Sequence, residues 1–261
     1  MPVLGLGVWR AEDGDEVRNS VRYAIQQGYR LIDTAAAYYN EAGVGQGIQE
    51  AGVPREELFI TTKVRNQDQG FESTLQAFEE SLKKLKLEYL DLYLIHWPGK
   101  VKFKDTWRAM EKLYEEGRIR AIGVCNFLEH HLDELIDSAR VVPMVNQVEY
   151  HPLLTQVELK QDCQRHQIQM QAWSPLMKGR LDIPLLKQLS EKYGKTPAQI
   201  VLRWDLQNGV VTIPKSVRPE RIVENAQVFD FELSDDDMEA IDNLNENHRF
   251  GFHPDVPFFD Q

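Results

Sequence analysis

The 261-residue chain has only two cysteines, Cys125 and Cys163, and they lie far apart. Neither a disulfide framework nor a cysteine-rich metal site is therefore indicated.

No apolar run reaches the length of a membrane span, and the Met-Pro start lacks the basic and apolar regions of a secretory signal. Positive charge is also scarce, because 30 Lys and Arg face 41 Asp and Glu, which gives a net charge of −11. Nucleic acid and anionic membranes attract positive surfaces, so neither is expected as the main partner. We expect a soluble cytoplasmic protein.

The order of apolar and amphipathic segments predicts the fold. Apolar runs with strand character recur along the chain, separated by segments with helical spacing. These runs are residues 3–9, 30–35, 58–64, 90–97, 119–126, 144–150, 168–174 and 210–214. Most successive runs start about 24 to 32 residues apart, the length of one βα unit, and the longer seventh interval holds two helical stretches, 182–193 and 196–207. The pattern predicts an α/β fold, a single (β/α)8 TIM barrel over residues 1–261.

A doubly wound parallel sheet is the alternative arrangement of such units. That fold binds dinucleotides through a GxGxxG turn after its first strand, and the sequence has no such turn. The segment GVGQG (43–47) has the wrong spacing, follows the second strand and lies within a helical pattern. We therefore give it no role in dinucleotide binding.

Polar residues stand at the carboxyl ends of the predicted strands, where the catalytic face of a TIM barrel lies. In chain order they are Asp33, Lys63, His96, Cys125, Asn126, Gln147, Glu149, Trp173, Ser174, Lys215 and Ser216. Taken singly, Asp33 and Lys63 could be a structural ion pair, His96 a core histidine, and Tyr38 a loop aromatic. Strands 2, 3 and 4 are neighbours, however, so their ends converge on one small volume.

This set of groups suits protonation of a carbonyl oxygen. A phenol has an ordinary pKa of about 10, which is high for an acid acting near neutral pH. An adjacent ammonium stabilises the phenolate, and we therefore expect Lys63 to lower the pKa of Tyr38. Asp33 would keep Lys63 charged and oriented, and His96 would hydrogen-bond the same carbonyl oxygen. Tyr38 is then the predicted proton donor.

These motifs resemble those of the aldo-keto reductase family over nearly the whole chain. The resemblance lies in Asp-(x)4-Tyr-x-Asn-Glu at 33–41, TTK at 61–63 and LIHWP at 94–98. It continues in family order through GVCNF (123–127), NQVEYHP (146–152), AWSPL (172–176), IPKS (213–216) and RIVEN (221–225). The sequence is most similar to the bacterial glyoxal/methylglyoxal reductase and diketo-acid reductase subgroup. The resemblance implies NADPH-dependent reduction of aldehydes, ketones or small dicarbonyls, with Asp33, Tyr38, Lys63 and His96 as the catalytic tetrad.

The resemblance also implies a set of residues that bind NADPH or NADP+. Asn126 and Gln147 match residues that bind the nicotinamide carboxamide, and Trp173 stands where the family stacks an aromatic ring on the nicotinamide. The further implied cofactor residues are Ser174 and Leu176 in the same segment, Lys215, Ser216 and Arg221 at the 2′-phosphate, and Glu224 and Asn225 at the adenosine. Independently, a basic cluster after the eighth strand is unexpected in so acidic a chain, and barrels commonly bind phosphate there. A solvated run of charge is the alternative.

Two features depart from the family pattern. Cys125 replaces a residue that is generally serine, which is expected to weaken one hydrogen bond to the carboxamide. The chain also begins at the first barrel strand, whereas relatives carry a preceding β-hairpin that plugs the barrel bottom. Either the gene start is misassigned or a barrel without this plug is expected.

The substrate pocket is expected at the same end of the barrel. Trp9, Trp97 and His96 are candidates to line it, with residues 244–261 as a C-terminal tail nearby. The tail aromatics Phe250, Phe252, Phe258 and Phe259 could contact substrate or pack on the barrel. No metal site is expected, because HExxH is absent and His130-His131 lies in a predicted surface helix, and no hydrolase site is expected, because GxSxG is absent.

Two other functions remain open from the residues. A Schiff-base aldolase would also place a lysine such as Lys63 at a strand end, although Asp33 beside it favours the charged amine. A nucleotide-sensing subunit would bind NADPH without useful turnover. By family likeness we expect a monomer with a small carbonyl substrate.

Overall fold

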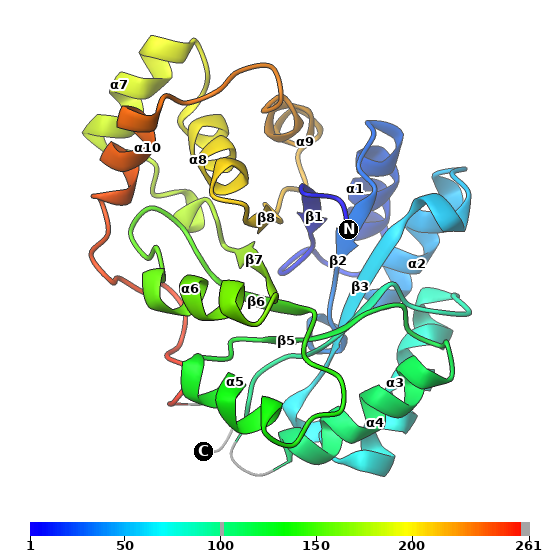
Figure 1. The fold of residues 1–261 in the computed structure, drawn as a ribbon. Coiled ribbons are helices and arrows are strands. Elements are labelled where there is room, and N and C mark those ends of the chain that lie inside the picture. Colours follow the sequence, from blue (N-terminus) through cyan, green and yellow to red (C-terminus); the bar gives the residue numbers. More distant parts are fainter. Residues whose placement is uncertain (100–101, 257–261) are drawn as a thin grey trace.

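Eight parallel strands form a closed barrel in the computed structural model, which describes residues 1–99 and 102–256 (Figure 1). The strands are β1 (Gly5–Gly7), β2 (Leu31–Asp33), β3 (Phe59–Val64), β4 (Leu92–Ile95), β5 (Ile122–Cys125), β6 (Val145–Glu149), β7 (Gln169–Trp173) and β8 (Val211–Thr212). They pair in chain order, and parallel bridges from Leu4 to Thr212 and from Gly7 to Lys215 join the first strand to the last. Each strand falls inside one of the predicted apolar runs. The predicted TIM barrel is confirmed.

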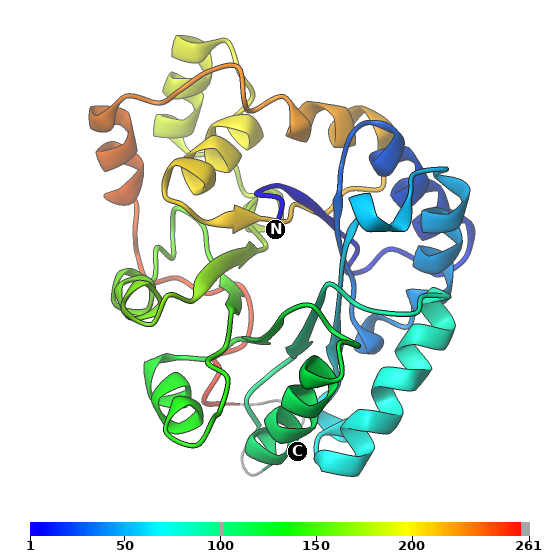
Figure 2. The ribbon, with the colours of Figure 1, turned by 45° about the vertical axis from the view of Figure 1, so that its right-hand side comes forward.

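Helices surround the strands on the outside of the barrel (Figures 1 and 2). The α-helices are α1 (Asp15–Gln26), α2 (Glu41–Glu50), α3 (Phe71–Leu85), α4 (Phe103–Glu115), α5 (Glu129–Ile136), α6 (Val157–Arg165), α7 (Pro184–Tyr193), α8 (Pro197–Gln207), α9 (Pro219–Ala226) and α10 (Asp235–Asp242). The long interval before β8 contains both α7 and α8, as the sequence predicts. Within the described ranges, no helix is long and apolar enough to cross a membrane.

The GVGQG segment lies within α2, and its glycines serve helix packing. A Cβ atom on Gly45 would lie 2.4 Å from the backbone oxygen of Leu85, at the end of α3. A Cβ on Gly47 would lie 2.6 Å from the backbone oxygen of Arg18, in α1. Both glycines therefore allow α2 to approach its two neighbours closely, which agrees with giving the segment no role in dinucleotide binding.

The alternation of side chains along each strand divides the core into two parts. In β4, Leu92 and Leu94 pack inside the barrel with Cys125 and Val145, whereas Tyr93 and Ile95 belong to the larger core between strands and helices. Both faces are buried, which explains why the strands read as continuous apolar runs. Toward the carboxyl ends of the strands, the interior positions change from apolar to polar residues.

The chain after α10 returns to the carboxyl end of the barrel, running past α6 and α5 (Figure 1). Backbone hydrogen bonds from Glu246 and His248 to the oxygen of Leu153 attach this tail to the β6–α6 loop. The tail therefore lies beside the polar strand ends, although it follows the barrel by sequence. The predicted pocket residues Phe258 and Phe259 lie outside the described residues.

Candidate active site

Lys63 lies at the centre of the polar cluster and is completely buried. It projects from β3, and its Nζ donates to Oδ1 of Asp33 at 2.6 Å and to the backbone oxygen of Thr34 at 2.9 Å. The phenol oxygen of Tyr38, from the short 3-10 helix η1 (Ala36–Tyr38), lies 3.5 Å from the same Nζ. The Tyr38 and His96 rings are 5.6 Å apart in an edge-on arrangement. The structure thus brings the four predicted catalytic residues together.

Lys63 is held in its charged form. Burial by itself lowers the pKa of an amine, but the Asp33 carboxylate, the Tyr38 phenol and the hydrogen bond to Asp33 outweigh it. The pKa of Lys63 is consequently raised above its ordinary value. A Schiff-base lysine needs a neutral amine, so this environment disfavours imine formation.

The pKa of Tyr38 departs from the sequence-based expectation. Burial raises the pKa of the phenol to about 12, although Lys63 acts in the expected direction and lowers it. The expected effect of Lys63 is present, but the net shift of the Tyr38 pKa is upward, because desolvation of the phenolate outweighs its stabilisation by the ammonium at 3.5 Å. At neutral pH the phenol is protonated, which is the form that donates a proton.

His96 is a neutral imidazole at physiological pH. Burial and the positive charge of Lys63 lower the pKa of His96 to about 3. A neutral ring carries one N–H donor and one acceptor nitrogen. His96 can therefore donate a hydrogen bond to a substrate oxygen without competing as a charged acid.

The second oxygen of Asp33 binds a residue from the far side of the barrel. Nε2 of Gln147, in β6, donates to Oδ2 of Asp33 at 2.7 Å and to Oε1 of Gln171, in β7, at 2.8 Å. Gln171 is completely buried, and its Nε2 has no hydrogen-bond partner. Gln171 was not predicted as a site residue, although a glutamine inside an apolar strand, two residues before Trp173, was a usable signal.

Asn126, Cys125 and Trp173 form a second contact group beside the tetrad. Nε1 of Trp173 donates to Oδ1 of Asn126 at 2.8 Å, and Nδ2 of Asn126 donates to the backbone oxygen of His96 at 3.0 Å. Asn126 holds a positive φ of 64°, which asparagine tolerates better than most residues. The predicted nicotinamide residues therefore lie directly against the predicted catalytic residues.

Cys125 contacts both predicted carboxamide ligands. Its sulfur accepts from Nδ2 of Asn126 at 3.2 Å and donates to Oε1 of Gln147 at 3.7 Å. Burial raises the pKa of Cys125, and this outweighs the opposing effect of Lys63. The side chain is thus a neutral thiol that occupies the expected serine position.

The Asn-Glu pair that ends the first motif is structural. Oδ1 of Asn40 accepts from Thr34, and its Nδ2 donates to the backbone oxygens of Val8 and Ala11. Oε1 of Glu41 accepts from Thr62 at 2.6 Å. The motif therefore ties the loop after β1 to the segment carrying Tyr38.

The predicted phosphate residues follow β8 and surround the start of α9. Ser216 is buried, and its Oγ accepts from the backbone nitrogen of Arg218 at 3.1 Å. Lys215 and Arg221 are exposed, and they form no ion pair with the described part of the chain. Oε1 of Glu224, a predicted adenosine contact, accepts from Thr196 at 2.9 Å, and Asn225 is buried. Unpaired cations in so acidic a protein suit an anionic ligand.

The other predicted ligand residues lie in the loops that follow the strands. Ser174 and Leu176 follow β7, and Ser174 has a positive φ of 54°. Trp9 follows β1 and is exposed, with the Arg10 guanidinium 4.4 Å above its ring. Trp97 follows β4, and its backbone oxygen accepts from Gln69. Their strand ends place both tryptophans at the same face as the tetrad.

The two tail aromatics within the described residues differ in exposure. Phe250 packs on the main core, with the His151 ring at 5.2 Å, whereas Phe252 is exposed. For Phe250, packing on the barrel is therefore the better-supported of the two roles that the sequence left open.

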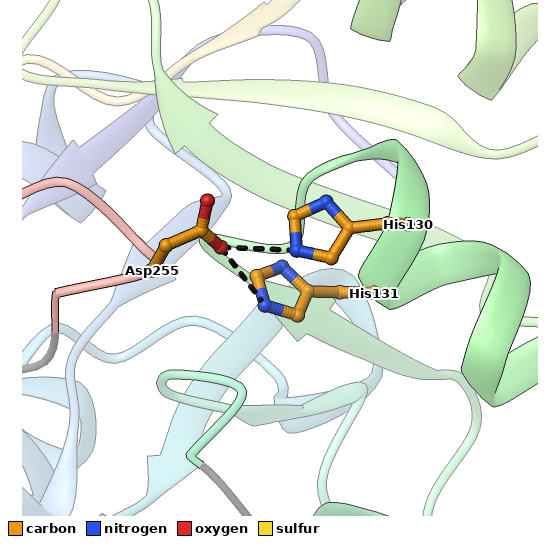
Figure 3. A group of neighbouring side chains, drawn as sticks. All are labelled: His130, His131 and Asp255. Atoms are coloured by element: carbon orange, nitrogen blue, oxygen red, sulfur yellow. Dashed lines mark ion pairs between the residues drawn. The ribbon is translucent and has the colours of Figure 1, made fainter.

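The predicted incidental pair His130 and His131 contacts the tail. Nε2 of His130 and Nε2 of His131 lie 3.0 and 3.3 Å from Oδ1 of Asp255, and Figure 3 shows both rings directed at this carboxylate. Nδ1 of His131 accepts from the backbone nitrogen of Leu128, so the neutral ring carries its proton on Nε2. A metal would need that nitrogen free of a proton, so the geometry fits hydrogen bonding better than metal binding.

Comparisons with known proteins agree with this geometry. The model of the Aldo/keto reductase family matches residues 3–246. The chain is 62% identical over 260 residues to a glyoxal reductase of Bacillus subtilis, covering 99% of this chain and 94% of that protein. It is 50% identical over 260 residues to a methylglyoxal reductase of Salmonella typhimurium, covering 98% and 94%. A solved aldo-keto reductase of Bombyx mori in complex with NADP is similar, with a TM-score of 0.92 and 39% identity over 98% of this chain and 92% of that one.

Proposed function

The chain belongs to the aldo/keto reductase family, and from that premise we propose that it reduces small aldehydes and dicarbonyls, such as glyoxal and methylglyoxal, to alcohols with NADPH. Its relatives include a glyoxal reductase and a methylglyoxal reductase, and a solved aldo-keto reductase that it resembles is in complex with NADP. The proposal adds Tyr38 as the proton donor and small dicarbonyls as the preferred substrates.

The observation that carries the proposal is the contact between Lys63 and Tyr38. The ammonium lies 3.5 Å from the phenol oxygen and 2.6 Å from Asp33. A buried phenol is a poor acid unless a cation stabilises the phenolate that remains after proton transfer. Lys63 supplies that cation, and Asp33 keeps it charged and fixed in place.

The chain has the groups that NADPH requires. Lys215, Ser216 and Arg221 offer two cations and a hydroxyl for the 2′-phosphate, and the buried Nε2 of Gln171 is an unsatisfied donor near the predicted carboxamide residues. Asn126 and Gln147 would hold the carboxamide, and Trp173 would stack on the ring. When bound, NADPH supplies a hydride to the carbonyl carbon.

The protein's own part in the reaction is placement and proton transfer. Neutral His96 donates a hydrogen bond to the carbonyl oxygen and orients the substrate. As the carbon–oxygen double bond becomes a single bond, the oxygen gains negative charge and takes the phenolic proton of Tyr38. Lys63 stabilises the phenolate, which regains a proton from solvent before the next turnover. The product is the alcohol.

Substitution of the phenol tests the assignment. Tyr38→Phe keeps the ring and removes the acid, so NADPH binding should persist while turnover of methylglyoxal falls by roughly 10²–10⁴-fold. Turnover is followed by loss of NADPH absorbance, and binding by calorimetry. A variant with more than about a tenth of the original turnover would place the acid elsewhere.

Two assays separate the alternatives. An aldolase would form an imine between Lys63 and the carbonyl substrate, which borohydride would trap in the absence of nucleotide. A nucleotide-sensing subunit would bind NADPH but turn over none of a panel of aldehydes.

A further inference from the structure

Glu149 is a buried carboxylate that the proposed mechanism does not use. It is the last residue of β6 and lies two positions after Gln147, so both side chains point to the barrel interior. Its side chain is completely buried, at the mouth of the barrel. A buried carboxylate is costly unless several donors satisfy it, so its partners indicate what it holds.

The partners of Glu149 belong mainly to the C-terminal tail. Oε1 accepts from the backbone nitrogen of Phe250 at 2.7 Å, and Oε2 accepts from that of Gly251 at 3.1 Å. Nε2 of His151 lies 3.2 Å from Oε1. Hydrogen bonds to a charged acceptor are about twice as strong as neutral ones. Glu149 therefore fixes the tail backbone at one defined point of the barrel mouth.

That point touches the residue predicted to stack on the nicotinamide. A Cβ atom on Gly251 would lie 2.4 Å from Cη2 of Trp173 and 3.1 Å from Oε2 of Glu149, so the tail backbone rests against the indole ring. In the barrel, Glu149 and Trp173 are also direct neighbours in the β6–β7 register. The ring is thus held by the tail as well as by its hydrogen bond to Asn126, and Glu149 holds the tail backbone at this point.

Packing alone does not hold the tail at this point. Gly251 also lines an open cavity of about 450 Å³, with Arg249 and His253 of the tail, Glu129 of α5 and Glu158 of α6. This cavity leaves space into which the segment can move. Polar contacts add to the packing of Phe250 on the core. They are those of Glu149, the donations from Lys178 to the backbone oxygen of Phe250 at 2.6 Å and from Arg249 to Gln156 at 3.2 Å, and, further along, the contacts of Asp255 with His130 and His131 (Figure 3).

We propose that Glu149 is a positioning residue for the reaction, which holds Gly251 against Trp173 and thereby sets the nicotinamide-stacking ring and the adjacent wall of the substrate pocket. The proposal rests on the proposed function, because Trp173 matters to the reaction only if the nicotinamide binds beside it. Glu149 itself touches neither Tyr38 nor Lys63, so it acts through the tail.

Glu149→Gln tests the proposal, because the amide keeps the shape and removes the charge. Amide hydrogen exchange of the peptide containing Phe250 and Gly251 should become faster. The Kd for NADPH, measured by calorimetry, and the KM for methylglyoxal should each rise by about three- to tenfold, since charge-assisted hydrogen bonds become neutral ones. The value of kcat should fall less, because the tetrad is untouched.

Glu111→Gln is the matched control. Glu111, in α4, is equally buried, and its Oε1 also accepts from two consecutive backbone nitrogens, those of Arg140 and Val141. These precede β6, at the opposite end of the barrel from Glu149. The control should lose stability and keep the Kd for NADPH and both kinetic constants.

Gly251→Ala provides a second route that leaves Glu149 intact. Its added methyl group should displace Trp173 and weaken NADPH binding. Unchanged NADPH affinity and KM in both the Glu149→Gln and Gly251→Ala variants would overturn the proposal, as would equal losses in Glu111→Gln. A wild-type protein without reductase activity would instead refute the proposed function, while the exchange and NADPH measurements would still test the role of Glu149.

Discussion

Asp33→Asn should destabilise the protein strongly near neutral pH and much less in alkali. The carboxylate receives one hydrogen bond from Lys63 at 2.6 Å and one from Gln147 at 2.7 Å, both buried. Asparagine offers one oxygen and one NH2 group, so one of these donors would face another donor. The Lys63 ammonium would also lose its only buried counter-charge among the described residues.

The size of the loss follows from the two states open to Lys63. Breaking a buried pair by removing one partner costs about 3–5 kcal/mol. Lys63 can avoid this penalty by losing its proton and becoming a neutral amine. At pH 7 the deprotonation costs about 4.6 kcal/mol, since the ordinary pKa of lysine is about 10.4 and each pH unit corresponds to about 1.36 kcal/mol. The charge penalty should therefore lie between about 3 and 4.6 kcal/mol, a large part of a typical folding free energy of about 5–15 kcal/mol.

The pH dependence has a defined sign. In the wild type the folded-state pKa of Lys63 is raised, so its stabilising contribution is complete below the ordinary lysine pKa and is lost only as pH rises through the folded-state value. In the variant the folded-state pKa of Lys63 falls below the ordinary value. Its penalty then shrinks by up to about 1.36 kcal/mol per pH unit and vanishes near pH 10.4.

Urea unfolding followed by tryptophan fluorescence at pH 7 and pH 9.5 would measure the difference. Asp230→Asn is the control, because Asp230 contacts Lys195 at the same 2.6 Å but on the surface, where ion pairs contribute little. It should change stability little at either pH. A loss of less than about 1 kcal/mol for Asp33→Asn at pH 7, or an equal loss of stability at both pH values, would show that Asp33 does not hold a buried charge on Lys63.

Three further outcomes are expected. Arg221→Ala should weaken NADPH by more than about tenfold and leave NADH nearly unchanged, because a charge-assisted hydrogen bond contributes about 1.5–3 kcal/mol; calorimetry with both cofactors checks this, and equal losses would show that Arg221 does not bind the 2′-phosphate. Cys125→Ser should tighten NADPH by about 0.5–1.5 kcal/mol, since a hydroxyl bonds Asn126 and Gln147 better than a thiol; unchanged affinity would mean that the cysteine only fills space. The value of kcat/KM for NADPH reports groups of the free enzyme and of free NADPH, whose 2′-phosphate titrates near about pH 6. It should stay flat from about pH 7 to 9, because Tyr38 with a pKa of about 12 stays protonated and His96 with a pKa of about 3 stays neutral; a limb inside that range would contradict these assignments.

The order of the strands in the barrel and the position of its catalytic face could be predicted from the sequence, because both depend on local patterns. Each βα unit carries its own apolar run and amphipathic helix, and parallel strands of a TIM barrel pair in chain order. Asp33, Lys63 and His96 end three consecutive strands, so their convergence follows from adjacency alone. The NADPH roles were predicted from resemblance and stay predictions.

Contacts across the barrel depend on its closure, and no local pattern contains them. Gln147 binds Asp33 over 114 residues of chain, and Phe250 binds Glu149 over 101 residues. From the sequence, Gln147 was predicted only as a cofactor ligand, and no partner was predicted for Glu149. The contacts of both side chains depend on the closure of the barrel, which brings distant strand ends and the tail together at the mouth of the barrel.

The ionisation of Tyr38 was also decided by the tertiary structure. From the sequence, a lysine beside the tyrosine indicates a lowered pKa, and Lys63 does act in that direction. The net shift is upward, because burial in the folded barrel desolvates the phenol. Neighbouring charges can be inferred from the residues at strand ends, whereas desolvation is a property of the whole packed environment and exists only once the chain has folded.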